Sequence, residues 1–364
     1  MTTTTTSPKP FASEEPHPKK RLGFNTRVSF PTGEAARGLR DGIELFKAAE
    51  ALGYQGGWAY QRHFDNYLSS PTPFFAAVGQ HTSRITLGSA VIPARYQEPI
   101  LLAEAAATAD LLSGGRLQLT LSSGTDIWDA VFGEVATDAR TEGQRRLAIF
   151  LAAVAGETIH TVTERKRSGP PVGTELKVTP HSPALRSRIW YGSGSNDSAD
   201  NAARQGLRLM TGTILHDVPA GESFAEHQAR LISAYRRAWS ASHEIPAPPV
   251  AVAASVLPGT TAELREKYAA YDLERRTFGP AASRPRGALE PTLSAELPDG
   301  MVMSPVYHGE PEAVVDAVLA DTGLSAADEL VLFLPPAFEL AESVRLLTDL
   351  AETVALDLGW EPAN

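Results

Sequence analysis

One βαβ segment, residues 84–124, constrains the fold of this chain more than any other stretch. It predicts a strand, then a helix that begins at Pro99 and is closed by Gly114, then a second strand that runs into Ser122. Proline suits a first helical turn because its missing N–H would have no acceptor there, and glycine tolerates the left-handed turn that ends a helix. Two parallel strands joined by a helix place the end of the second strand where α/β enzymes keep their chemistry.

Strand-like and helical runs alternate along the rest of the chain. The predicted strands are residues 21–29, 57–60, 84–92, 116–121, 189–191, 208–211, 250–256 and 329–334. Two segments rich in Gly and Pro, 163–188 and 277–305, fit no regular element and are predicted as insertions after strands four and seven. Eight short apolar strands alternating with helices predict an α/β fold of the closed TIM type, a (β/α)8 barrel, with a doubly wound open sheet as the alternative.

The predicted domain organisation is simple. Residues 1–20 contain no apolar run behind their charges and are expected to form a disordered tail instead of a secretory signal. Residues 21–360 are expected to form a single barrel domain, since 364 residues suffice for one barrel with insertions. No apolar run is long enough for a membrane span, so the expected location is cytoplasmic with no membrane partner.

Composition excludes several function classes. The formal net charge of −10, from 43 acidic and 33 basic residues, argues against a nucleic-acid partner, which needs a concentrated positive face. The absence of cysteine excludes disulfides, thiolate metal sites and cysteine nucleophiles. The nine histidines show no metal-ligand spacing, so no metal site is expected.

A loop of small hydroxyl residues after the fifth strand is the best local candidate for a binding site. Residues 190–198 read WYGSGSNDS, a strand end followed by a helix start. The sequence begins like a dinucleotide fingerprint, but Asp197 stands where the third glycine would be. Backbone N–H groups at a helix start, joined by serine hydroxyls, could bind a phosphate. The alternative is that Ser195 or Ser198 only caps the helix.

Several motifs together resemble the luciferase-like flavin-dependent monooxygenases, and within them a bacterial FMN-dependent subgroup. They agree in order from about residue 21 to residue 360. The motifs are WAYQRHF at 58–64, LSSP at 68–71, LGSAV at 87–91, LAE at 102–104, DLLSGGR at 110–116 and the loop at 192–198. The resemblance implies a TIM-type barrel that binds reduced flavin at the C-terminal ends of its strands.

The resemblance also implies cofactor-binding residues, by position. Gly194, Ser195 and Ser198 would hold the FMN phosphate, and Arg140 would pair with it, although an exposed charge before a helix is an equal alternative. A cis non-proline peptide against the flavin ring would fall at Ala90–Val91. Ser122 would lie under the reactive edge of the ring.

The catalytic positions depart from the luciferase pattern after the second strand. An acidic residue, two histidines and Phe are expected there, but the chain has Gln61, Arg62, His63 and Phe64. Arginine is not a proton acceptor at working pH, so Arg62 could instead bind an anionic substrate group. His63 could act in catalysis or equally be a packed barrel residue.

The expected reaction follows from the resemblance. Reduced FMN and dioxygen would give a flavin hydroperoxide that oxygenates a small organic substrate, with the 277–305 insertion as a cover against water. Because the chain lacks a nicotinamide fingerprint, FMNH2 is expected from a separate flavin reductase. The alternatives are a deazaflavin-dependent hydride-transfer enzyme and a non-catalytic flavin-binding subunit. Substrate choice is expected to depend on both insertions. The chain is also expected to form a homodimer through helices near strands two and three.

Overall fold

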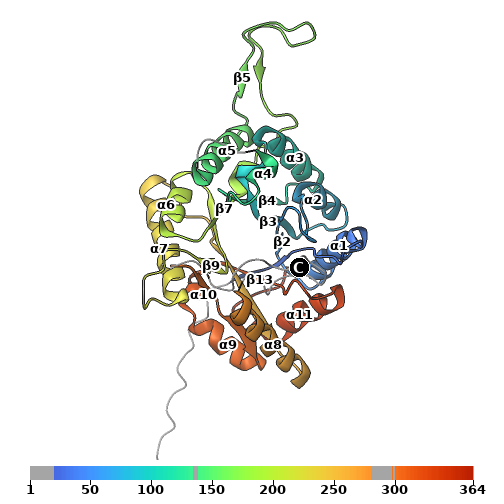
Figure 1. Cartoon of the computed structure of the whole chain (residues 1–364), viewed down its shortest axis with the longest axis vertical. Helices are drawn as coiled ribbons and strands as arrows, with labels where there is room; N and C mark the ends of the chain where they lie inside the picture. The colour runs from blue at the N-terminus through green and yellow to red at the C-terminus, as the bar shows by residue number, and fades with distance from the viewer. Residues whose placement is uncertain (1–19, 134–137, 280–296, 298–299, 364) are drawn as a thin grey trace, which may run out of the picture.

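The computed structural model describes residues 20–363 except 134–137, 280–296 and 298–299. Eight parallel strands form a closed barrel in the order β1-β2-β3-β4-β7-β8-β10-β13, closed by the pairing of β13 with β1 (Figure 1). Their bounds are Arg21–Thr26, Gly56–Ala59, Thr86–Pro93, Leu117–Ser122, Ile189–Ser193, Arg208–Thr211, Ala251–Pro258 and Glu329–Phe333. The predicted (β/α)8 barrel is therefore confirmed, and the open-sheet alternative is wrong.

Helices surround this barrel (Figure 1). The long ones are α1 (Ala35–Ala51), α2 (Pro71–Gly79), α3 (Pro99–Leu112), α5 (Ala139–Val154), α6 (Asn196–Arg204), α7 (Phe224–Ser242), α8 (Ala262–Phe278), α9 (Pro311–Ala320) and α11 (Leu340–Thr353). Short elements are α4 (Asp129–Phe132), α10 (Thr322–Ala326), β5 (His160–Thr161), β6 (Glu175–Leu176), β9 (Ile214–Leu215), β11 (Val302–Met303) and β12 (Val306–Gly309). Most predicted boundaries agree to within about three residues, whereas α8 has no predicted counterpart.

The strands separate two hydrophobic layers. Their outward side chains pack against the helices in one large core, and a smaller cluster fills the barrel interior. The interior cluster consists of Trp58, Ala90, Trp190, Met210, Ala251, Ala253 and Val331. Because side chains alternate along a strand, this cluster fixes which residues point into the barrel at its C-terminal mouth.

The glycines of α1 correct one predicted helix face. The helical spacing of Leu39, Ile43 and Phe46 predicts that all three lie on the buried face, but the Leu39 side chain is 37% exposed. The buried face instead includes Gly38 and Gly42, where an added Cβ would lie 2.6 Å from Phe30 and 2.8 Å from Val28. The absence of side chains at these two positions lets α1 approach the loop after β1 closely, which rotates Leu39 toward solvent.

The first predicted insertion forms an arm at the N-terminal end of the barrel. Its hairpin of β5 and β6 follows the C-terminus of α5 and projects away from the barrel (Figure 1). Helices run antiparallel to the strands in this fold, so the arm lies at the end opposite to the predicted site. The expectation that residues 163–188 contribute to substrate choice is therefore wrong. Of the second insertion, residues 280–296 and 298–299 lie outside the described residues.

The two ends of the described chain meet. Lys20 forms a β-bridge with Trp360, and its ammonium group donates to the carbonyl of Ala327 at 2.6 Å. The predicted tail, residues 1–20, lies outside the described residues apart from Lys20.

Candidate active site

The C-terminal mouth of the barrel collects the predicted site residues. Alternation from the interior cluster places Ser122 of β4, Gly192 of β7 and Ser255 of β10 on the inner surface. The same alternation places Phe333 of β13 there. The mouth is therefore lined by small and polar side chains on the β4 and β7 side.

The serine loop begins α6 with a reciprocal capping box. The Ser195 hydroxyl accepts a hydrogen bond from the backbone N–H of Ser198 at 3.4 Å, and the Ser198 hydroxyl accepts one from the N–H of Ser195 at 3.3 Å. Ser193 lies 2.6 Å from the same Ser198 oxygen. The capping alternative is thus observed, and it assembles three hydroxyls at a helix start whose first N–H groups have no acceptor within the helix.

Gln144 joins the start of α5 to this loop, a link that the sequence did not indicate. Its amide nitrogen donates to Ser123 at 3.0 Å and to Tyr191 at 2.9 Å. Its amide oxygen accepts from Asn201 of α6 at 3.2 Å. One side chain therefore ties the ends of β4 and β7 to both neighbouring helices.

Arg140 lies one helical turn before Gln144, in the first turn of α5. Ser198 lies about one turn before Asn201 on α6. Because Gln144 contacts Asn201, the same register brings the start of α5 level with the serine loop. Arg140 is exposed, and no contact joins its side chain to Ser195 or Ser198. Its pairing with a phosphate stays a prediction.

His216 is a further residue near the serine loop that sequence reasoning missed. Its backbone N–H donates to the carbonyl of Gly194 at 2.7 Å, and a Cβ added to Gly194 would lie 2.6 Å from its ring. Gly194 is therefore required by the close approach of the imidazole. No local sequence signal indicates this contact, since His216 follows the next strand.

Small residues let β3 and β7 approach each other across β4 on the inner surface of the barrel. The peptide bond between Ala90 and Val91 is cis, the conformation that the resemblance implies at this position. A Cβ added to Gly192 would lie 2.7 Å from Cγ1 of Val91. The missing side chain at Gly192 makes room for Val91, and Ala90 and Gly192 add little bulk to this surface, which is compatible with a planar group against the backbone.

His63 lies apart from Ser122. Its ring packs against Phe132 at 4.9 Å between centroids, and its Nε2 is 3.4 Å from the Gln61 amide. It lines a cavity of about 390 Å³ together with Tyr96 and Ile92, and Ile92 faces the helices. Burial lowers the pKa of His63, which favours the neutral imidazole. No contact among the described residues joins His63 to Ser122.

Arg62 is partly neutralised. Its Nε lies 3.1 Å from a carboxylate oxygen of Asp65. The predicted role of Arg62 as an anion-binding group would therefore compete with this ion pair.

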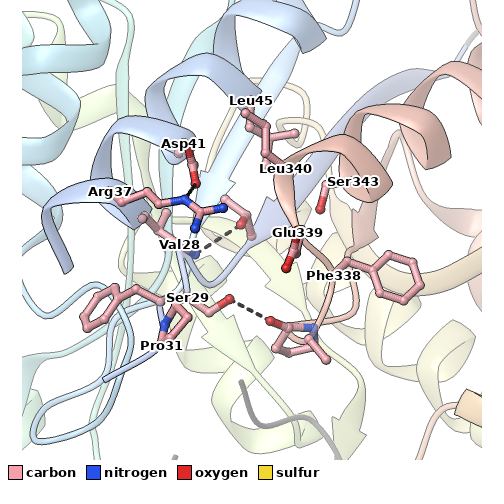
Figure 2. Close-up of a pocket in the computed structure, with 16 residues that line it drawn as sticks. Val28, Ser29, Pro31, Arg37, Asp41, Leu45, Phe338, Glu339, Leu340 and Ser343 are labelled. Atoms are coloured by element: carbon pink, nitrogen blue, oxygen red, sulfur yellow. Dashed lines mark hydrogen bonds and ion pairs between the residues drawn. The ribbon is translucent and has the colours of Figure 1, made fainter. Parts of the chain in front are cut away.

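A second cavity, of about 100 Å³, lies between α1 and α11 outside the barrel (Figure 2). Arg37 and Asp41 on its rim lie 3.5 Å apart, and Ser29 donates to the carbonyl of Pro336 at 2.6 Å. Its polar groups bind one another, and it contains none of the predicted site residues.

The DLLSGGR motif belongs to the opposite end of the barrel. Arg116 donates to the backbone carbonyls of Ser113, Ile85, Gly79 and Thr82 at 2.7 to 2.9 Å. Asp110 accepts from the N–H of Leu117 at 3.0 Å and from Arg188 at 2.6 Å. These residues hold the fold together and do not reach the mouth.

Membrane-spanning helices and metal clusters are both absent from the described residues. Within the described ranges, no helix combines the length and the apolar character needed to cross a bilayer. The described part of the chain also gathers no group of three or more His, Asp or Glu side chains suited to a metal ion.

Comparison with known proteins identifies the family. The model of the luciferase-like monooxygenases matches residues 22–326. The chain belongs to this family. Its barrel is thus a luciferase-like monooxygenase barrel, and the chain is an oxidoreductase by family.

Relatives of this luciferase-like monooxygenase match over parts of their length. It is 28% identical over 194 residues to 4-hydroxyprotoasukamycin monooxygenase of Streptomyces nodosus subsp. asukaensis, which is 48% of this chain and 52% of that protein. It is 31% identical over 105 residues to the oxygenase component of flavin-dependent trigonelline monooxygenase of Acinetobacter baylyi, which is 28% of this chain and 29% of that protein. The chain therefore spans about half of the first relative and less of the second.

Solved structures share the fold of this luciferase-like monooxygenase. The monooxygenase RslO1 from Streptomyces bottropensis superposes with a TM-score of 0.69 at 18% identity, covering 92% of this chain and 98% of that one. The oxygenating constituent of 3,6-diketocamphane monooxygenase of Pseudomonas putida, in complex with FMN, superposes with a TM-score of 0.69 at 16% identity. The match covers 93% of this chain and 98% of that one. An F420-dependent secondary alcohol dehydrogenase superposes with a TM-score of 0.63 at 12% identity, covering 93% of this chain and 99% of that one. At these identities the likeness shows the fold alone.

Proposed function

We propose that the chain is a flavin-dependent monooxygenase that uses reduced FMN and dioxygen to oxygenate a small organic substrate. The observation that carries this proposal is the serine loop at the start of α6, which Gln144 ties to the start of α5. A helix start with several hydroxyls and a nearby guanidinium is suited to a phosphate dianion. The FMN complex of the diketocamphane enzyme shares this fold.

Ser195 is the hydroxyl best able to turn toward a phosphate. The Ser198 hydroxyl donates to the carbonyl of Ser195 at 2.9 Å, and Ser193 has acceptors in Ser195 and Ser198. Ser195 can accept from the Ser198 N–H and still donate its own proton to a ligand. Gly194 and Ser198 shape the loop, and Arg140 supplies the positive charge from α5.

The inner surface beside Ala90 and Val91 is where the flavin ring would lie, above Ser122. Bound reduced FMN would supply the reaction with dioxygen. Ser122 would donate or accept one hydrogen bond at the ring edge. His63, neutral because burial lowers its pKa, would accept a proton at a ring nitrogen, while Arg62 stays paired with Asp65.

Two matched serine variants test the phosphate site. Ser195→Ala removes a cap and a phosphate donor, whereas Ser223→Ala removes the equivalent capping box at the start of α7, which forms no hydrogen bond with the serine loop among the described residues. Each should cost about 1 kcal/mol of stability. Only Ser195→Ala should weaken FMN binding, by about tenfold, measured by fluorescence titration. Equal FMN affinity in the two variants would contradict the site.

Turnover tests the reaction and its partner. Purified protein mixed with a flavin reductase, NADH and a panel of aldehydes, ketones and sulfonates should consume dioxygen with formation of an oxygenated product. A relative is named as an oxygenase component, which supports the separate reductase. Peroxide release alone across the panel would count against the proposal, and tighter binding of F420 than of FMN would favour the hydride-transfer alternative. Stoichiometric FMN binding without turnover would favour a non-catalytic subunit.

Homodimer formation is proposed through the outer face of α3. Leu101, Ala105, Thr108 and Leu112 recur at helical spacing on this face, and both leucines are more than half exposed. Leu101→Lys should convert a dimer to a monomer in sedimentation velocity. Val172→Lys on the projecting arm, at 61% exposure, is the control that should leave the mass unchanged.

A further inference from the structure

Two arginines lie at the side of the barrel mouth opposite to the serine loop. Arg275, in the last turn of α8, is only 4% exposed and donates to Ser255 of β10 at 2.9 Å and to Ser304 at 3.2 Å. Arg27, directly after β1, places its guanidinium over the Phe333 ring of β13 at 5.4 Å. Both side chains therefore rest on inward-facing residues of the mouth.

The strand register brings these two guanidinium groups together. Ala254 of β10 pairs with Leu332 of β13, so Ser255 and Phe333 are the next residues along the two neighbouring strands. Arg275 is bound to the first and Arg27 stacks on the second. Burial is the largest cause that lowers the pKa of Arg275, and repulsion from Arg27 also lowers it. The strand register thus places the two guanidinium groups on neighbouring strands, near enough for their charges to repel each other.

Compensation of this pair by carboxylates of the described residues is only partial, because the charge of Asp272 raises the pKa of Arg275 from a distance. Among the described residues, no Asp or Glu lies within ion-pair distance of either guanidinium. The nearby Asp272 is bound to Arg276 at 2.8 Å. Arg27 is instead held by aromatic rings, with Tyr60 at 4.7 Å and Tyr67 at 5.0 Å. Two adjacent cations in a buried place are costly unless an anion joins them, and the chain as a whole is acidic.

The pair is separate from the proposed phosphate site. In the barrel order, β7 lies four strands from β1 in one direction and three from β13 in the other through β8 and β10. The serine loop follows β7, whereas Arg27 follows β1 and stacks on β13. A phosphate bound at Ser195 would not contact Arg27 and Arg275, so these two arginines could bind a second anion across the mouth.

We infer that Arg27 and Arg275 form a specificity site for the anionic group of the substrate, a carboxylate or a sulfonate. This inference rests on the proposed function, since it takes the mouth as the place of oxygenation. Arg275 would donate from the guanidinium that Ser255 and Ser304 orient, and Arg27 would supply a second cation held in place by its aromatic neighbours. The site then selects acids over neutral compounds of the same carbon skeleton.

Binding measurements with paired probes test the inference. Hexanoate, benzoate, hexanesulfonate and benzenesulfonate are compared with hexanol and benzyl alcohol by calorimetry, on the full chain with and without FMN. At least one acid should bind about tenfold or more tightly than its neutral counterpart, because a charge-assisted hydrogen bond is lost in the neutral probe. Absence of any such preference would overturn the inference.

Matched variants locate the preference. Arg275→Gln and Arg27→Gln should each remove it, and Arg275→Lys should keep part of it. Arg276→Gln is the control, because Arg276 is the next residue of α8 but its side chain is 69% exposed. If Arg275→Gln fails to fold, the acid preference measured in Arg27→Gln tests the inference by itself. A preference that persists in both Gln variants would overturn the inference.

The FMN titration separates this inference from the proposed function. An FMN affinity that falls in Arg275→Gln, with no acid preference in the wild-type protein, would assign the pair to the flavin and overturn the inference. An acid preference that depends on both arginines in a protein that fails to bind FMN would uphold the site and overturn the proposed cofactor.

Discussion

Gly143 of α5 is the position at which a single methyl group should test the architecture of the proposed flavin site. A Cβ added there would lie 2.2 Å from the carbonyl oxygen of Ser123 and 2.6 Å from its Cα. Both atoms belong to the backbone at the end of β4, so no side chain can rotate away. Ordinary contacts need about 3.5 Å, so Gly143→Ala must move α5 away from β4 by about 1 Å.

This displacement has two separable consequences. Overpacking costs about 1 to 3 kcal/mol, and the better helix propensity of Ala returns up to about 1 kcal/mol, so the melting temperature should fall by only a few degrees. The same movement carries Arg140 and Gln144 away from the serine loop. Loss of one charge-assisted hydrogen bond to the phosphate, worth about 1.5 to 3 kcal/mol, should weaken FMN binding by about ten- to a hundredfold.

Thermal unfolding and FMN titration on the same preparations provide the measurement. Gly169→Ala, in the projecting arm, is the matched control, because its added Cβ would meet only Lys166 at 3.3 Å. Its stability should change by less than about 0.5 kcal/mol and its FMN affinity not at all. Wild-type FMN affinity in a destabilised Gly143→Ala would refute the role given to α5. An unchanged melting temperature would refute the close packing itself.

Three further perturbations have defined outcomes. Arg116→Met leaves four backbone carbonyls without their donor and should lower the free energy of unfolding in urea by about 4 kcal/mol. A decrease below about 1 kcal/mol would contradict the stabilising role of these four hydrogen bonds. Asp197→Asn removes an exposed negative charge from the first turn of α6 and should tighten FMN binding about two- to fivefold at low salt, less at high salt, while an effect insensitive to salt would argue against a charge effect. The hydrogen bond from Arg145, aided by Arg146 and opposed by burial, lowers the pKa of Glu142 from 4.5 to about 2. Its carboxylate therefore adds stability above about pH 4.5, and this stability is lost as the pH falls toward 2. The free energy of unfolding of Glu142→Gln should therefore decrease less steeply with acid than that of the wild type. Equal slopes would disprove the stabilising role of the Glu142 carboxylate.

The barrel could be predicted from the sequence because each of its elements carries a local signal. Pro99 begins α3 and Gly114 follows its end, and the predicted strand 208–211 matches the structure residue for residue. The missed helix α8 lacks such a signal. Its buried positions are Tyr268, Tyr271, Asp272 and Arg275, so it has no aliphatic stripe. A helix that buries polar groups at the mouth of a barrel does not show the usual periodicity.

The candidate site could be predicted only where it is contiguous. The serine loop lies within one stretch of nine residues, and its hydroxyls at a helix start are a visible pattern. The roles of Gln144 and His216 could not be predicted from the sequence. They depend on contacts with Tyr191 and Gly194, respectively, and only the fold brings these residues together. Alternation along a strand could have placed Ser122 in the mouth, but nothing local connects His63 to a cavity on the helical side of β3.

The buried arginines of the barrel differ in their partners, and one of them gives a physical reason to look for function at the mouth. At the N-terminal end, Arg116 is bound by four carbonyls and Arg188 by Asp110, so each cation has partners within the chain. At the C-terminal end, Arg95 is paired with Asp129. Arg275, in contrast, is buried with two neutral hydroxyls and lies near Arg27. Among the described residues, no carboxylate lies within ion-pair distance of this pair of arginines, and a buried pair of cations is stabilised by a further anion. We therefore expect the anionic group of the substrate to complete the pair, and this expectation comes from the contrast between arginines within one molecule.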